Sequence, residues 1–139
     1  MSKDKIFLDA NILFSVAYGS STLDYLWEIS KKGHCLLLAS NYVIEEARRN
    51  LTTKEQLKKL DACLADVQVV LEADPALPCP IDLPDKDRPV LMAAITAKAD
   101  YFITGDIKHF ENHFGKKVIG IKICMARDYL QPKMMSKPA

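Results

Sequence analysis

The sequence has few of the features that mark disulfide-rich, zinc-binding or membrane proteins. Its four cysteines, Cys35, Cys63, Cys79 and Cys124, are far apart and form no C-x-x-C pair, which argues against a zinc site and against a small disulfide scaffold. No apolar run approaches the length that a membrane span needs. The polar N-terminus, MSKDK, has no hydrophobic signal region. We therefore expect a soluble protein of the reducing cytoplasm with no membrane contact.

The chain also lacks a large net charge, internal repeats and low-complexity tracts. Lys and Arg number 19 against 18 acidic residues, a formal net charge of +1, so any nucleic-acid contact must come from a local cluster of basic residues. The 139 residues, about half of them apolar, suffice for one domain with a buried core. We expect a single domain over 1–130 and a flexible C-terminal tail over 131–139.

Hydrophobic spacing predicts strands that alternate with helices along the chain. Such alternation indicates a three-layer α/β/α fold, with a mainly parallel sheet of about five strands covered by helices on both faces. Four prolines between 73 and 84 exclude a helix interior or a central strand there, so this segment is expected to be a connecting loop. The expected strands are 6–8, 35–39, 67–71, 101–104 and 118–123, and the expected helices are 21–32, 40–51 (capped by Ser40), one from Thr52 or Thr53 to 64, 85–97, a short helix or turn at 107–114, and 127–130.

Carboxylates occur at four places that such a sheet brings to one edge. Asp9 and Asp106 each end a short apolar strand. Asp87, with Asp85 beside it, begins the helix before the Asp106 strand, and Glu46 lies on or near the apolar face of the helix that follows the second strand. Because ligands bind beyond the carboxyl ends of parallel strands, these acids are expected to form one site.

Each acid taken alone also has a structural interpretation. Asp9, Asp85 and Asp106 are suited to helix N-caps, Asp87 to the positive end of a helix, and Glu46 to pairing with a neighbour on the helix surface. Taken together the acids would repel one another unless a cation neutralised them. Oxygen ligands with no accompanying His or Cys pattern favour Mg²⁺ or Mn²⁺. The chemistry indicated is metal-assisted hydrolysis of a phosphodiester.

Four segments, FLDANILF, SNYVIEEARRNL, LPDKDRPVLMAAITAKADYFITGD and KVIGIKICMARDYL, resemble in this order the motifs of the PIN-domain ribonucleases. The resemblance extends from about Lys5 to Leu130. It implies a PIN-like fold and a Mg²⁺- or Mn²⁺-dependent endoribonuclease that cleaves single-stranded RNA. Many small members of the family are VapC toxins, which an antitoxin covers and which are often dimeric. The implied partners are therefore RNA, an antitoxin protein and a second copy of the chain.

The same resemblance assigns roles to individual residues. It implies that Asp9, Glu46, Asp87 and Asp106 are catalytic, that Asp9, Asp87 and Asp106 hold the metal, and that Asn11, Thr104 and Asp85 support them. Glu45 remains an alternative to Glu46, although a step of one residue turns a side chain about 100° around a helix. The spacing from Ser40 favours Glu46.

Weaker expectations concern RNA binding and competing functions. Arg88, Arg48, Arg49 and His109 could contact RNA, or they could belong to solvated helix surfaces. A phosphatase of the haloacid-dehalogenase type would need an Asp where Asn11 stands, so it fits poorly. The main alternative is a catalytically silent PIN-like module that binds RNA or a protein partner.

Overall fold

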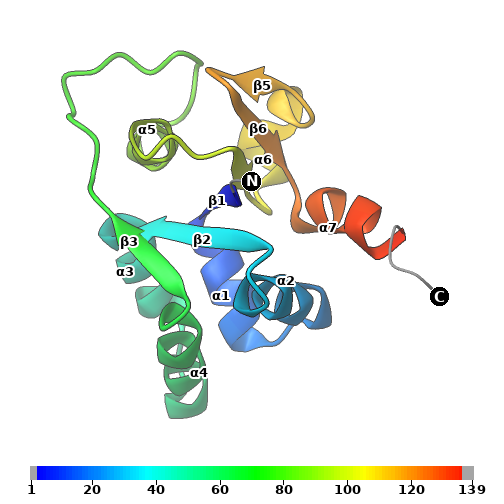
Figure 1. The fold of residues 1–139 in the computed structure, drawn as a ribbon. Coiled ribbons are helices and arrows are strands. Elements are labelled where there is room, and N and C mark those ends of the chain that lie inside the picture. Colours follow the sequence, from blue (N-terminus) through cyan, green and yellow to red (C-terminus); the bar gives the residue numbers. More distant parts are fainter. Residues whose placement is uncertain (1–2, 136–139) are drawn as a thin grey trace.

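A computed structural model describes residues 3–135, in which six strands form one mostly parallel sheet of order β3-β2-β1-β4-β6-β5 (Figure 1). Only the pairing of β5 with β6 is antiparallel. The α/β prediction is confirmed, with one strand more than the five expected. The strands are β1 (Asp4–Leu8), β2 (Cys35–Ser40), β3 (Val67–Val70), β4 (Tyr101–Ile103), β5 (Lys117–Val118) and β6 (Ile121–Cys124).

Helices lie on both sides of this sheet, as the three-layer prediction requires. Figure 1 shows α1, α2 and α4 below β2 and α5 above it. Within residues 3–135, no helix combines the length and the apolar composition that crossing a bilayer would need. The helices are α1 (Ala10–Tyr18), α2 (Ser21–Lys31), α3 (Asn41–Asn50), α4 (Lys54–Leu64), α5 (Arg88–Thr96), α6 (Ile107–Phe110) and α7 (Ala126–Met135), with a 3-10 turn η1 (Glu111–His113) after α6.

The central strands are buried on both faces, as parallel strands between two helical layers must be. Phe7 of β1 and Phe102 of β4 are fully buried and stack with their ring centroids 5.9 Å apart. Burying a large apolar side chain contributes about 1.5–3 kcal/mol. The stacked pair therefore contributes to the packing of β1 against β4.

The sheet order places a topological switch point between β1 and β4. The chain first adds β2 and β3 on one side of β1 and then returns to add β4 on the other side. At the carboxyl end of this seam the Asp9 amide donates to the Ile103 carbonyl at 3.0 Å. In open α/β sheets the crevice beyond such a point is where ligands bind.

Two stretches depart from the predictions made along the chain. The apolar segment after Asp9 was not assigned, and it forms α1. The prediction of one continuous strand over 118–123 was wrong, because the chain turns within this segment and forms the β5–β6 hairpin. The turn contains Ile119 and Gly120, with φ of 48° and 79°. A positive φ is rare for a β-branched residue such as Ile119, so the sequence pattern did not indicate the turn.

The C-terminal helix is longer than predicted. It begins at Ala126 and continues through Pro132 to Met135, so the predicted helix end at Leu130 was wrong. The flexibility expected over 131–135 stays a prediction. The rest of that predicted tail, 136–139, lies outside the described residues. The Tyr129 hydroxyl donates to Asp4 Oδ2 at 2.9 Å, and Lys133 Nζ lies 3.6 Å from the same oxygen. These contacts attach α7 to the start of β1.

The four cysteines are all free thiols. Cys35 and Cys124 are buried, and burial raises the pKa of each to about 11. Both thiols therefore stay protonated near neutral pH and act as small apolar side chains in the core.

Candidate functional site

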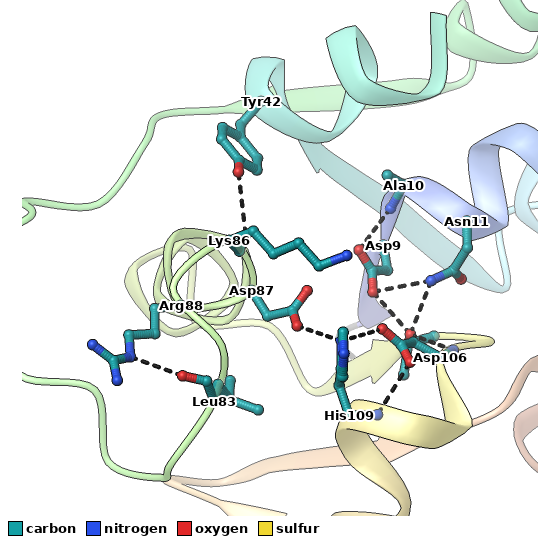
Figure 2. Close-up of polar contacts among 11 residues, drawn as sticks. Asp9, Ala10, Asn11, Tyr42, Leu83, Lys86, Asp87, Arg88, Asp106 and His109 are labelled. Carbon is teal, nitrogen blue, oxygen red and sulfur yellow. Dashed lines mark hydrogen bonds and ion pairs between the residues drawn. The ribbon is translucent and has the colours of Figure 1, made fainter. Parts of the chain in front are cut away.

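Asp9 stands where β1 ends and α1 begins, and it is almost fully buried, with 6% of its surface exposed. Its Oδ1 accepts a hydrogen bond from the Ala10 amide at 2.8 Å. Its Oδ2 accepts from the Thr104 hydroxyl at 2.8 Å and from Asn11 Nδ2 at 3.2 Å. Asp9 thus has the capping position that the structural interpretation expected, while its second oxygen is held at the β1–β4 seam (Figure 2).

Thr104 and Asn11 join the ends of β1 and β4. The Thr104 hydroxyl is fully buried, and it accepts hydrogen bonds from the Asp106 amide at 3.0 Å and from Asn11 Nδ2 at 3.2 Å. Asn11 Oδ1 accepts from the Gly105 amide at 2.7 Å. Two of the three residues predicted to support the acids, Asn11 and Thr104, therefore lie in contact with Asp9.

Asp87 is the N-cap residue of α5, but its carboxylate makes no capping hydrogen bond. The preceding turn is attached to α3 by the Tyr42 hydroxyl, which donates to the Lys86 carbonyl at 3.2 Å. Only 7% of Asp87 is exposed. Its Oδ2 lies 2.7 Å from Nδ1 of His109, so the carboxylate is directed toward the strand ends (Figure 2).

Asp106 and His109 occupy the first turn of α6. Asp106 Oδ1 accepts from the His109 amide at 3.1 Å, which is a regular N-cap bond. Asp106 Oδ2 lies 2.7 Å from His109 Nδ1, so the imidazole stands between Asp87 and Asp106. From the sequence, His109 was expected only as a weak RNA contact. Its spacing of three residues from a capping Asp was the available signal for this contact.

Burial and mutual repulsion disfavour the charged forms of these acids. Burial raises the pKa of Asp9 to about 6, against the lowering effect of the hydrogen bonds from Thr104 and Ala10. The carboxylates of Asp87 and Glu46 contribute smaller increases to this value of about 6. Burial is also the main cause that raises the pKa of Asp87. A bound cation would remove this penalty.

Glu46 is half-buried on α3, whereas Glu45 is exposed to solvent. The effect of Glu46 on the pKa of Asp9 shows that its charge lies close enough to act on the site. Between the two candidates for the second acid, the arrangement favours Glu46.

Arg88 and Asp85 do not join the cluster of acids. They pair with each other at 3.1 Å, and Arg88 Nε donates to the Leu83 carbonyl at 3.0 Å. Both line a separate hollow of about 1000 Å³ under the proline-rich loop. In Figure 2 Arg88 points away from Asp9. The contact of Asp85 is with Arg88 and not with the other acids, so the structure gives no support for its expected supporting role.

The two other arginines predicted to contact RNA lie on α3. Arg48 NH2 pairs with Asp61 of α4 at 3.0 Å, so it joins two helices. Arg49 is exposed to solvent. Of this pair Arg49 is the one placed to contact a substrate without breaking a bond within the protein.

The chemistry of the donors fits a divalent cation. One ligand atom each from Asp87, Asp106 and His109 lies within 4.8 Å of the others. Asp87 Oδ2 and His109 Nδ1 are buried, and neither has a partner aligned for a hydrogen bond, although they are only 2.7 Å apart. Buried polar atoms are normally satisfied, so these two atoms have unused capacity for a ligand.

Comparison with known proteins bears on the fold and the family. A chain of the VapBC2 complex from Rickettsia felis, solved bound to a DNA fragment from the promoter, superposes with a TM-score of 0.62 over 86% of this chain and 96% of that chain. The two are 15% identical, so the likeness concerns the fold. No curated protein sequence matches. The sequence model of the PIN domain matches residues 5–108, which include Asp9, Glu46, Asp87 and Asp106, and the chain therefore belongs to the PIN domain family.

Proposed function

We propose that the chain is a Mg²⁺- or Mn²⁺-dependent endoribonuclease that hydrolyses phosphodiester bonds of single-stranded RNA. The observation that carries the proposal is the gathering of Asp9, Asp87 and Asp106 at the β1–β4 switch point. There burial raises the pKa of Asp9 to about 6, with a further contribution from the neighbouring Asp87 carboxylate. Such a group of acids is stabilised by a cation, and a cation held there can promote phosphodiester hydrolysis.

Each residue has a role in the proposed reaction. Asp9, Asp87 and Asp106 would hold the cation, which when bound polarises a phosphoryl oxygen and lowers the pKa of a water molecule. Thr104 fixes Asp9 through its 2.8 Å hydrogen bond. Glu46, on α3 beside Asp9, is the acid that we assign to accept the proton of the attacking water.

A positive side chain near the acids supports an anionic substrate. Lys86 precedes Asp87, is exposed, and extends its amino group toward Asp9 in Figure 2. The Lys86 charge lowers the pKa of Asp87, although burial has the larger, opposite effect. We propose that Lys86 and the exposed Arg49 contact RNA phosphates, since such contacts position a nucleic acid without selecting its sequence.

We further propose that the chain acts in the cytoplasm as the toxin of a pair, with an antitoxin protein as partner and a homodimer as the working form. The likeness to a chain of a VapBC2 complex supports the antitoxin. The four free thiols suit a reducing compartment. Co-purification with the product of the adjacent open reading frame, and the mass of the purified chain in solution, test these two partners.

The alternative is a silent module that binds RNA or a protein without cutting. The four acids count against it, because a module of this kind has no need to gather carboxylates that repel one another. Retained RNA binding in EDTA, with no turnover under Mg²⁺ or Mn²⁺, would favour the silent module.

The test is cleavage of single-stranded RNA in Mg²⁺, Mn²⁺ and EDTA, with Asp9→Asn and Asp106→Asn compared with wild type. We expect cleavage to require the cation and to fall by about a hundredfold or more in each variant, the magnitude typical for lost transition-state electrostatics. Asp24→Asn is the matched control, because Asp24 is an exposed acid on α2 that pairs with Lys59. Cleavage that survives both site changes would refute the proposal.

A further inference from the structure

We infer that His109 supplies a nitrogen ligand to the cation of this site and so shifts its preference from Mg²⁺ toward transition-metal ions such as Mn²⁺ and Co²⁺. The inference rests on the proposed function and specifies its cofactor. It also corrects one premise of the sequence analysis, in which the acids had no accompanying histidine. In the folded chain His109 stands among them (Figure 2).

The positions of the donor atoms support a shared ion. His109 Nδ1 is 2.7 Å from Asp87 Oδ2 and 2.7 Å from Asp106 Oδ2. Neighbouring ligand atoms that each lie about 2.1 Å from one octahedral ion are roughly 3 Å apart. Small side-chain shifts therefore suffice to make these three donor atoms, which all lie within 4.8 Å of one another, ligands of one ion.

The backbone also holds the imidazole in place. The His109 amide is bonded to Asp106 Oδ1 at 3.1 Å, so the histidine and this acid are fixed within the same turn of α6. On the other side Asp87 is the N-cap of α5. Donors contributed by two separate elements are thus already directed at one point.

A second observation points to a ligand rather than to a simple ion pair. Asp87 is more than nine-tenths buried, and its Oδ2 has no partner aligned for a hydrogen bond. His109 Nδ1, which lies 2.7 Å from this oxygen, is buried and makes no aligned hydrogen bond either. Leaving such a group unsatisfied costs about 1–3 kcal/mol. A cation bound beside the two atoms, with each of them as a ligand, would satisfy both.

The choice of metal follows from the donor set. Mg²⁺ is bound by oxygen atoms and water, whereas imidazole nitrogen is a common ligand of transition-metal ions. Affinity for a mixed nitrogen and oxygen site rises from Mn²⁺ toward Co²⁺. Replacing an oxygen ligand by His109 therefore weakens the competition from Mg²⁺.

The test is pulsed electron paramagnetic resonance of Mn²⁺ added to the full chain, together with calorimetric titration of Mn²⁺ and Mg²⁺. We expect a ¹⁴N coupling to Mn²⁺ in wild type that His109→Asp abolishes. We also expect the ratio of Mn²⁺ to Mg²⁺ affinity to fall about tenfold or more in His109→Asp. His113→Gln is the matched control, because His113 is a half-buried histidine in η1, next to α6, and it should keep both the coupling and the ratio.

The outcomes separate this inference from the proposed nuclease function. Mn²⁺ that binds wild type without ¹⁴N coupling overturns the inference, and RNA cleavage under Mg²⁺ would then leave the nuclease intact. Coupling without any cleavage supports the inference and contradicts the nuclease. An unchanged affinity ratio in His109→Asp, with circular dichroism confirming the fold, overturns the inference and assigns His109 to charge balance alone. Failure of both ions to bind overturns both proposals.

Discussion

Gly105 and Asn11 face each other across the carboxyl ends of β4 and β1. The Gly105 amide donates to Asn11 Oδ1 at 2.7 Å, and a Cβ atom at Gly105 would lie 3.3 Å from that same oxygen. The close approach of backbone to side chain thus depends on the missing side chain of Gly105. Asn11 in turn donates a hydrogen bond to Asp9. A change at Gly105 that moves Asn11 is therefore expected to affect the candidate site.

We predict that Gly105→Ala displaces Asn11 by a few tenths of an ångström and weakens its bond to Asp9. The free energy of unfolding should fall by about 1 kcal/mol, the usual contribution of one hydrogen bond, and RNA cleavage should fall with it. Urea denaturation of Gly105→Ala, Asn11→Ala and the double variant measures the coupling. If the two changes are simply additive, the proposed contact does not carry the effect.

The buried Thr104 hydroxyl is the second point of support. Thr104→Val keeps the shape but leaves the Asp106 amide and Asn11 Nδ2 without their shared acceptor, so we expect a loss of about 1–3 kcal/mol in stability. Because the Thr104 bond lowers the pKa of Asp9, that pKa should rise above its present value of about 6. Carboxyl-carbon NMR titration in EDTA checks this rise.

Thr96→Val is the control for this change. Thr96 is exposed at the end of α5, where its hydroxyl donates to the Met92 carbonyl of its own helix. We expect less than about 0.5 kcal/mol of destabilisation there, as at most surface positions. Equal losses in the two valine variants would contradict the role given to Thr104.

Stability should depend on pH through Asp9 when no divalent cation is present. The native pKa of about 6 lies above the value of 3.8 for a free side chain, so the folded state binds the proton more tightly than the unfolded state. The free energy of unfolding should therefore decrease as pH rises from about 4 to about 6, by up to roughly 3 kcal/mol for this 2.2-unit shift.

Denaturant titrations in EDTA at several pH values, with wild type and Asp9→Asn, measure this dependence. The slope should become shallower in Asp9→Asn without vanishing, because the pKa of Asp87 is raised as well. Asp24→Asn should keep the wild-type slope. An Asp9→Asn variant whose slope matches wild type would show that Asp9 does not retain a proton in this range.

Arg49 and Arg88 should separate RNA binding from stability. Arg49→Ala should reduce the dependence of RNA affinity on salt by about one phosphate contact and change stability by less than about 0.5 kcal/mol. Arg88→Ala removes the bonds to Leu83 and Asp85, so it should destabilise the protein by about 1 kcal/mol. Fluorescence anisotropy across a salt series and thermal unfolding measure the two effects, and the reverse pattern would contradict the assignment.

Local signals were sufficient to predict most of the fold. The apolar run before Asp9 and the spacing of Leu23, Leu26 and Trp27 each identify one element, because the period of buried residues differs between strands and helices. The β5–β6 hairpin depends instead on a positive φ at Ile119, which the residue type disfavours. The continuation of α7 past Pro132 goes with contacts of Tyr129 and Lys133 to the distant Asp4.

The candidate site divides in the same way. Positions at strand ends and helix starts were sufficient to bring Asp9, Asp87 and Asp106 to one edge of the sheet, since parallel topology itself imposes that convergence. The place of His109 between two acids required the relative position of α5 and α6, which no local pattern encodes. Arg88 and Asp85, which were also expected at the site, pair with each other instead.

The pairing of β1 with β4 also determines at what stage of synthesis and folding the site can form. Asp9 and Thr104, which share a 2.8 Å hydrogen bond, are separated by 95 positions in sequence. A ribosome must therefore synthesise the segment beyond Asp106 before the acids can meet. A nascent chain that ends before Asp106 lacks one of the acids, and an unfolded chain keeps them apart, so under the proposed function neither form could cleave the RNA around it.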